Sequence, residues 1–282
     1  MLTRIAPFLF VLLWSTGFIG AKLGLPHAAP LSFLFVRYLL VITLMASIAL
    51  LWRAPWPRDG RIWFHVGVSG LLVHALYLGG VFVAIGKGLP AGIASLVVGL
   101  QPLLTATLAG WLLGETIRPR QWIGLLLGFV GVALVVSGKL GSGFALDALW
   151  PAVAALIGIT TGTLYQKRFC PSFDWRSGAV AQFIPTALVT GAIVAMQDGI
   201  RIDWTGEFVF ALGWLVLVLS VGAISLLNWL IRHGNAVNVA SLFYLTPPTT
   251  ALLAWLIFGE TLSGVALFGM ALAVWGVYLS RR

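Results

Sequence analysis

Long apolar stretches dominate the chain. Nine windows contain no Asp, Glu, Lys or Arg, and a tenth is interrupted only by Arg37. A membrane span needs about 20 mostly apolar residues. The nine windows are residues 5–21, 62–86, 88–114, 121–138, 148–166, 177–197, 208–231, 234–259 and 262–280, and the tenth is 28–52. This pattern predicts an all-α integral membrane protein of ten transmembrane helices joined by short turns.

Composition excludes several other classes of protein. The chain is 60% hydrophobic and 9% charged, with a mean hydropathy of +1.02. A soluble domain carries about a quarter charged residues, so a soluble enzyme and a disordered binder are excluded. The single Cys170 cannot form an internal disulfide, which excludes a secreted disulfide scaffold. Loops that face the cytoplasm explain the net charge of +9 better than a nucleic-acid partner does.

The basic residues predict the orientation in the membrane. With the amino terminus inside, 12 Lys and Arg fall in cytoplasmic segments and 4 outside, with Arg37 in the membrane. The positive-inside rule then places both termini in the cytoplasm. The alternative is that the first window, which follows Arg4, is a cleaved signal peptide.

The two halves of the chain repeat each other. When the sequence is shifted by 145 positions, 13 of the 33 residues in 102–134 are identical to their counterparts. The matches include Pro102 with Pro247, and Gly114-Glu115-Thr116 with Gly259-Glu260-Thr261. We therefore predict two repeats, 1–145 and 146–282. Because five helices is an odd number, the second repeat would cross the membrane in the opposite sense, which is typical of secondary transporters.

The repeated motifs resemble a known family. They are Trp14-Ser15-Thr16-Gly17-Phe18, Ala84-Ile85-Gly86, Ala94-Ser95-Leu96, Gln101-Pro102 and Leu113-Gly114-Glu115 in the first half, and Ala240-Ser241-Leu242, Pro247 and Gly259-Glu260 in the second. They are similar to the EamA repeat of the drug/metabolite transporter superfamily. Within it, the chain is most similar to exporters of aromatic and other amino acids. The resemblance implies a central cavity between helices one to four and six to nine, with helices five and ten outside it.

Polar and aromatic residues in the middle of the windows are candidates for substrate binding. They are Trp14, Ser15, His74, Tyr77, Gln101, Thr105, Thr163, Ser225, Asn228, Trp229 and Tyr244. For each of them, a hydrogen bond between helices is the alternative role. Together they predict an apolar, aromatic cavity with a few neutral donors, which suits a small zwitterion with an apolar side chain. We expect Ala in place of Tyr77 or Trp229 to impair transport more than assembly.

Two ionisable residues lie deep in the windows, where such groups are costly. Arg37 is about ten residues into its window, and its repeat counterpart is Gln182. It could snorkel, bind carbonyl groups of neighbouring helices or attract a substrate carboxylate. His74 could be a neutral residue bonded to another helix, or it could contact substrate or carry a proton.

The motifs at the window ends favour structural roles. Glu115 and Glu260 can each accept hydrogen bonds from the amide groups that begin the following helix, although a gate or ion site is the alternative. Pro102 and Pro247 predict kinks, which could be hinges or could only shape the cavity.

Glycines at helix-packing spacing occur on both outermost windows. Gly124, Gly128 and Gly131, with Gly264, Gly269 and Gly276, could pack the fifth helix on the tenth or form a dimer face. We expect a monomer or a weak dimer in the lipid bilayer.

The absence of certain residue types from the windows limits the mechanisms that the protein could use. All eight carboxylates fall in loops or at helix ends, which argues against proton-driven export of cationic drugs. No Gly-rich phosphate loop, spaced metal-ligand set or activated nucleophile is present, so we expect no enzyme activity, no cofactor and no metal. The sequence favours export of amino acids, broad in specificity, by facilitative alternating access. The alternatives are export of other small metabolites or neutral drugs such as purines, with His74 as a proton carrier, or a channel or lipid-handling protein.

Overall fold

The computed structural model describes residues 2–89, 91–137, 146–170, 173–197, 199–259 and 261–281. In these ranges the regular structure is helical, apart from one antiparallel bridge between Ala28 and Ile202. Nine helical segments of the described chain are long and apolar enough to cross a membrane. The helix α14 is also apolar but has only 17 residues. The expected all-helical membrane fold is confirmed.

The helices of the first half are α1 (Leu2–Gly24), η1 (Leu25–His27), α2 (Pro30–Leu51), α3 (Gly60–Gly70), η2 (Leu71–Leu78), α4 (Gly79–Gly86), α5 (Ala91–Val98), α6 (Gln101–Leu113) and α7 (Pro119–Ser137). Those of the second half are η3 (Leu146–Ala148), α8 (Leu149–Phe169), α9 (Trp175–Met196), α10 (Gly206–Trp214), η4 (Leu215–Ala223), α11 (Ile224–His233), α12 (Ala236–Ser241), η5 (Leu242–Leu245), α13 (Thr246–Phe258) and α14 (Gly264–Ser280). The predicted repeat boundary after residue 145 falls at the end of 138–145, a segment outside the described residues.

The same span is broken in each half. The window of residues 88–114 is two helices, α5 and α6, and its counterpart, 234–259, is α12, the 3-10 turn η5, and α13. Pro102 and Pro247 lie in the first turn of α6 and α13, where a proline without an amide hydrogen is tolerated. The predicted kinks are therefore full helix breaks, each followed by a proline that starts the next helix.

The repeated Gly-Glu pair has a backbone explanation. Gly114 and Gly259 follow α6 and α13 with φ of 68° and 65°, in the left-handed region that a side chain disfavours. Each glycine ends its helix and turns the chain. Glu260 lies outside the described residues, so its predicted role stays a prediction.

Two π-helical segments also occupy equivalent positions. The segment η2 joins α3 to α4, and η4 joins α10 to α11. Shifted by 145, Leu71–Leu78 falls within η4. A π-helical turn widens the helix, re-aims its side chains and is often found at functional sites. The first carries His74 and Tyr77, and the second carries Ser220.

The helices α7 and α14 pack backbone to backbone. An added Cβ at Gly131 would lie 2.4 Å from the Ala273 nitrogen, and one at Gly276 would lie 2.3 Å from the Gly128 nitrogen. Gly124 similarly meets the backbone of Ser280. These glycines thus pack α7 on α14 inside one molecule and are not free to form a dimer face. Gly264, by contrast, has no heavy atom within 4 Å of its would-be Cβ.

Equivalent helices run antiparallel, which makes the second half an inverted copy of the first. On α7 and α14 the order of contacts is reversed, since Gly124 meets Gly276 and Gly131 meets Gly269. The counterparts α2 and α9 also pack together, with the rings of Tyr38 and Phe183 5.5 Å apart. Tyr38 and Phe183 are themselves repeat counterparts, so the pseudo-twofold axis passes close to this contact.

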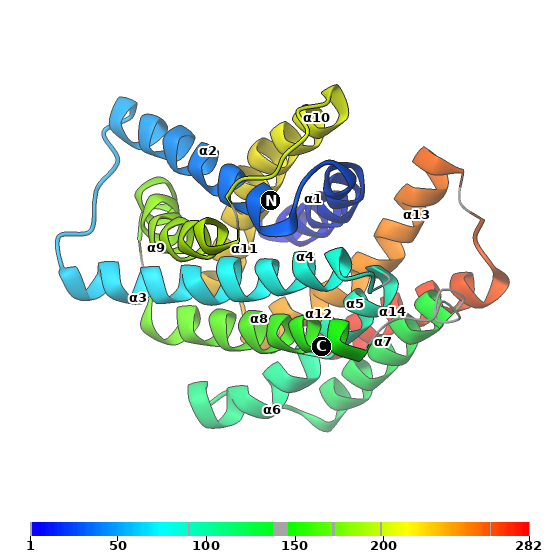
Figure 1. Ribbon diagram of the computed structural model, residues 1–282. Coiled ribbons are helices and arrows are strands. Elements are labelled where there is room, and N and C mark those ends of the chain that lie inside the picture. The colour runs from blue at the N-terminus through cyan, green and yellow to red at the C-terminus, as the bar shows by residue number, and fades with distance from the viewer. Residues whose placement is uncertain are drawn as a thin grey trace.

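The helix α8 defines the two ends of the molecule. Figure 1 shows α3 and α4 as one long rod beside α8, and Gly80 and Gly158 allow the close contact. At one end of α8, Lys87 Nζ lies 2.9 Å from Asp147 Oδ2. At the other end, Lys167 Nζ lies 3.5 Å from Glu115 Oε1. We name these the Asp147 end and the Glu115 end.

Candidate functional site

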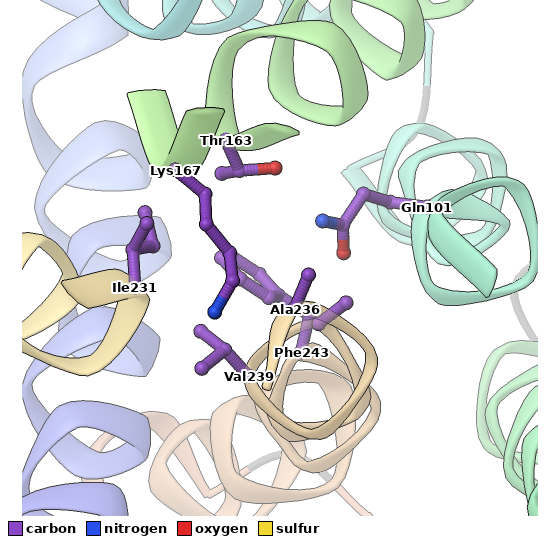
Figure 2. A pocket seen from close by; sticks show the side chains of 8 residues that line it. Gln101, Thr163, Lys167, Ile231, Ala236, Val239 and Phe243 are labelled. Carbon is purple, nitrogen blue, oxygen red and sulfur yellow. The ribbon is translucent and has the colours of Figure 1, made fainter. Parts of the chain in front are cut away.

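A small pocket lies near the Glu115 end, and we call it the lysine pocket. Figure 2 shows the amide of Gln101 and the hydroxyl of Thr163 on its walls, with Lys167 reaching across it. Its lining comes from α6, α8, α11, α12 and η5, so both repeats contribute: Gln101, Thr163, Lys167, Ile231, Ala236, Val239, Ala240 and Phe243. It combines an apolar floor with neutral donors and one cation.

Lys167 and Ala236, which line this pocket, both contact Glu115. Both carboxylate oxygens of Glu115 lie 3.1 Å from the backbone nitrogen of Ala236, the first residue of α12. Lys167 pairs with Glu115 and also donates to the carbonyl of Gly234. The sequence predicted an amide contact with the following helix, α7. The structure instead places it on α12 in the other repeat, because the α6–α7 turn lies against the start of α12.

We expect Glu115→Ala to destabilise the protein by roughly 1–3 kcal/mol, because it removes a hydrogen bond to the start of α12 and an ion pair. The side chains of the pair are only 13% (Glu115) and 22% (Lys167) exposed. Unfolding of the purified protein in mixed micelles measures the change. Glu207→Ala is the matched control, since that exposed carboxylate contacts His27 at 3.4 Å on the surface. Equal stability of the two variants would contradict a capping role.

A second pocket lies toward the Asp147 end, and we call it the aromatic pocket. Its walls are apolar apart from the indole of Trp14 and the hydroxyl of Tyr77, whose rings stack with centroids 6.2 Å apart. The lining residues are Trp14, Gly17, Phe18, Ala21, Tyr77, Leu78, Val81, Phe82, Ile85 and Leu219. Leu219 of η4 brings the second repeat into this pocket too.

One lining residue of each pocket takes part in an aromatic contact between them. Trp14 lines the aromatic pocket and Phe243 lines the lysine pocket. Their rings meet edge to face, with centroids 5.3 Å apart, and Phe10 packs on both. Phe243 lies in η5, directly beside the α12–α13 break.

Arg37 is fully buried between the two π-helical segments. Its Nε and Nη2 each donate to Ser220 Oγ in η4 at 3.0 Å. The adjacent Tyr38 donates to the carbonyl of His74 in η2 at 2.8 Å. The Nη1 atom of Arg37 has no hydrogen-bond partner in the described part of the chain.

Three amide side chains form a closed ring between α8, α9 and α11. Gln166 donates to Asn228 at 3.0 Å, Asn228 donates to Gln182 at 3.3 Å, and Gln182 donates back to Gln166 at 3.2 Å. Gln182 also donates to Ser69 of α3 at 3.1 Å. All four residues are buried, so the ring joins four helices without any charge.

We expect Asn228→Leu to destabilise the fold by roughly 2–4 kcal/mol, because it leaves the donor of Gln166 and the acceptor of Gln182 buried and unpaired. Ser225→Ala, one turn away on the half-buried face of α11, is the control. Equilibrium unfolding with the double variant Asn228→Leu/Gln182→Leu tests the ring, since coupled residues give non-additive changes. Additive changes would argue against a ring.

The structure places four predicted binding residues at the pockets. Trp14 and Tyr77 line the aromatic pocket, while Gln101 and Thr163 line the lysine pocket. Thr163 also donates to the carbonyl of Ile159 at 2.8 Å, so its hydroxyl is held within α8.

The other predicted binding residues line neither pocket. Ser15 donates to the carbonyls of Val11 and Thr246, which ties α1 to α13. The ring of His74 stacks on Phe183 with centroids 4.2 Å apart, because the π-helical turn directs it toward α9. Thr105, one turn after Gln101, is buried within α6.

The candidate residues of α11 and η5 also lie outside both pockets. Asn228 belongs to the amide ring, Trp229 stacks on His233 at 4.6 Å, and Ser225 is half-buried. The ring of Tyr244 lies against Gly128 of α7, where an added Cβ would be 2.5 Å from it. Tyr244 therefore points toward the α7–α14 pair instead of the pockets.

Three residues are not among the candidates from the sequence: Phe243 and Lys167, which line the lysine pocket, and Gln166 of the amide ring. Phe243 lies in an apolar run, and the sequence does not distinguish it from its neighbours except that it directly precedes the candidate Tyr244. Lys167 is one of the 12 basic residues that the predicted orientation places in cytoplasmic segments, although it matches Lys22 in the repeat. Gln166 lies three residues after Thr163, and that helical spacing was the available signal. Among the described residues, no three His, Cys, Asp or Glu side chains gather in a way that could hold a metal ion.

Comparison with known proteins gives matches along nearly the whole chain. Residues 3–137 and 148–282 each match the EamA-like transporter family. The uncharacterized inner membrane transporter YedA of Escherichia coli K12 is 29% identical, covering 97% of this chain and 91% of that protein. A protein of Salmonella typhimurium named "Probable amino-acid metabolite efflux pump" is 27% identical, covering 96% and 92%.

A solved crystal structure has the same fold. It matches this structure with a TM-score of 0.79 and covers 98% of this chain and 94% of its own. The sequences are 23% identical, so the match bears on the fold alone.

Proposed function

The chain belongs to the EamA-like transporter family and is a multi-pass inner membrane transporter, and on that premise we propose that it exports amino acids, aromatic and other, by alternating access. One observation carries the proposal: two neighbouring pockets, one toward each end of the molecule, meet at the contact between Trp14 and Phe243. Both pockets combine residues of the two repeats. Rocking of one repeat against the other would open one pocket as the other closes.

The proposed orientation has ten spans and both termini in the cytoplasm. The tenth span is α14, whose 17 residues extend about 25 Å and would need local thinning of the bilayer. The excess of Lys and Arg supports this orientation. The lysine pocket would then face the cytoplasm and the aromatic pocket the outside. Because the glycines of α7 and α14 are used within one molecule, we propose that the working unit is a monomer.

Cargo and energetics follow from the side chains that line the pockets. Stacked aromatic rings and a few neutral donors suit a small zwitterion with an apolar side chain. Relatives named as amino-acid metabolite efflux pumps support the same cargo. The described carboxylates lie in loops or first helical turns, and His74 lines neither pocket. We therefore favour transport down the substrate gradient, without chemical conversion, over proton-coupled export of purines or neutral drugs.

Exchange of labelled phenylalanine into liposomes that contain the purified protein tests the proposal. We expect saturable exchange that is indifferent to an imposed pH gradient and is reduced by an excess of other amino acids. No exchange would reject amino acids as cargo. Accumulation that follows the pH gradient would reject the facilitative mechanism, and retention of that gradient dependence in His74→Ala would clear His74 of carrying the proton.

A further inference from the structure

Arg37 is a cation in the membrane that pairs with no anion among the described residues. The described acidic residues lie in loops or the first turn of a helix, and none pairs with the guanidinium. Its side chain is fully buried, and Ser220, its hydrogen-bond partner, is neutral. An unpaired charge inside a membrane protein is costly, and such groups are retained chiefly for function. The Nη1 atom is therefore a buried hydrogen-bond donor without an acceptor among the described residues.

The guanidinium lies one layer behind the aromatic pocket. Leu219, which lines that pocket, directly precedes Ser220 in η4. Tyr77, another lining residue, is in η2. Each π-helical segment thus contributes both to the pocket lining and to the surroundings of Arg37, through Leu219 and Ser220 in η4 and through Tyr77 and the His74 carbonyl that Tyr38 contacts in η2. A shift of either segment toward α-helical geometry would rotate its side chains and expose Nη1 to the pocket.

We propose that Arg37 Nη1 binds the carboxylate of a ligand whose apolar or aromatic body occupies the aromatic pocket beside Trp14 and Tyr77. This inference deepens the proposed function, because it names the group by which the cargo is held. Ser220 fixes the guanidinium through Nε and Nη2 and leaves Nη1 available to the ligand. The described residues that line the pocket carry no charge, so the lining adds no cation to Arg37. One guanidinium balances the single charge of a carboxylate and would leave a dianion with an unpaired charge.

Binding of two matched probes tests the proposal. The probes are 3-phenylpropionate and its neutral amide, titrated calorimetrically into the purified full chain. We expect the acid to bind at least tenfold more tightly than the amide, as a charge-assisted hydrogen bond implies. Arg37→Gln should weaken the acid about 10- to 100-fold, leave the amide unchanged and remove the preference. Lys87→Gln removes a positive charge at the surface and should match the parent protein.

Three results would overturn the proposal: equal binding of acid and amide to the parent protein, absence of acid binding, or equal weakening of both probes by Arg37→Gln. If Arg37→Gln fails to fold, Arg37→Lys decides. Its shorter ammonium would bond Ser220 and not reach the ligand, so loss of the preference supports the proposal and full preference contradicts it. Because the probes are not amino acids, failure of phenylalanine exchange would reject the cargo without changing this test.

Discussion

Gly276→Ala is expected to abolish most folded protein, although the change adds one methyl group. The new Cβ would lie 2.3 Å from the backbone nitrogen of Gly128 and 2.6 Å from the backbone oxygen of Gly124. Both are main-chain atoms of α7, so no side chain can rotate away. Relief would require the two helices to separate along their shared length. Overpacking against flexible neighbours costs about 1–3 kcal/mol, and this contact should cost at least the upper value.

The measurement is the yield and unfolding midpoint of the purified protein, with Gly264→Ala as the control. Gly264 begins the same helix, and an added Cβ there meets no atom within 4 Å. Alanine also favours the helix over glycine by about 1 kcal/mol, so the control should be neutral or slightly stabilising. Equal stability of the two variants would show that α7 and α14 do not pack as described.

Much of the fold could be predicted because its determinants are local. Uncharged windows predicted the spans, and the 145-residue shift predicted two repeats, which the family match confirms. The repeated Pro and Gly predicted interruption at the right places, since both act on their own backbone. The sequence could not show that Glu115 caps α12, because that contact joins residues 121 positions apart.

The candidate site was harder to predict because it depends on helix geometry that an apolar run does not encode. In a regular α-helix, His74 and Tyr77 share a face. In the π-helical η2 they part, so that Tyr77 lines a pocket and His74 stacks on Phe183. Asn228 shows a second limit. A buried amide side chain can hydrogen-bond either a substrate or another helix. The residues that Asn228 bonds, Gln166 and Gln182, lie on α8 and α9, far from it in the sequence.

Trp14→Leu is expected to lower saturable exchange at least tenfold while leaving a folded protein. The indole stacks on Tyr77 in the aromatic pocket and meets Phe243 edge to face, so its loss removes a binding surface and weakens the contact between the pockets. Leucine keeps much of the apolar bulk, which limits the loss of stability. Initial exchange rates in liposomes, normalised to inserted protein, give the effect, and the unfolding midpoint reports assembly.

Trp229→Leu makes the comparison decisive, because it is the same substitution at an aromatic residue that lines neither pocket. Trp229 is half-buried and stacks on His233, so its variant should exchange within about twofold of the parent protein. The sequence alone expected Trp229 to matter as much as Tyr77. Equal loss in both tryptophan variants would restore that expectation and move the transport path toward α11. Unchanged exchange in Trp14→Leu would remove the aromatic pocket from the path altogether.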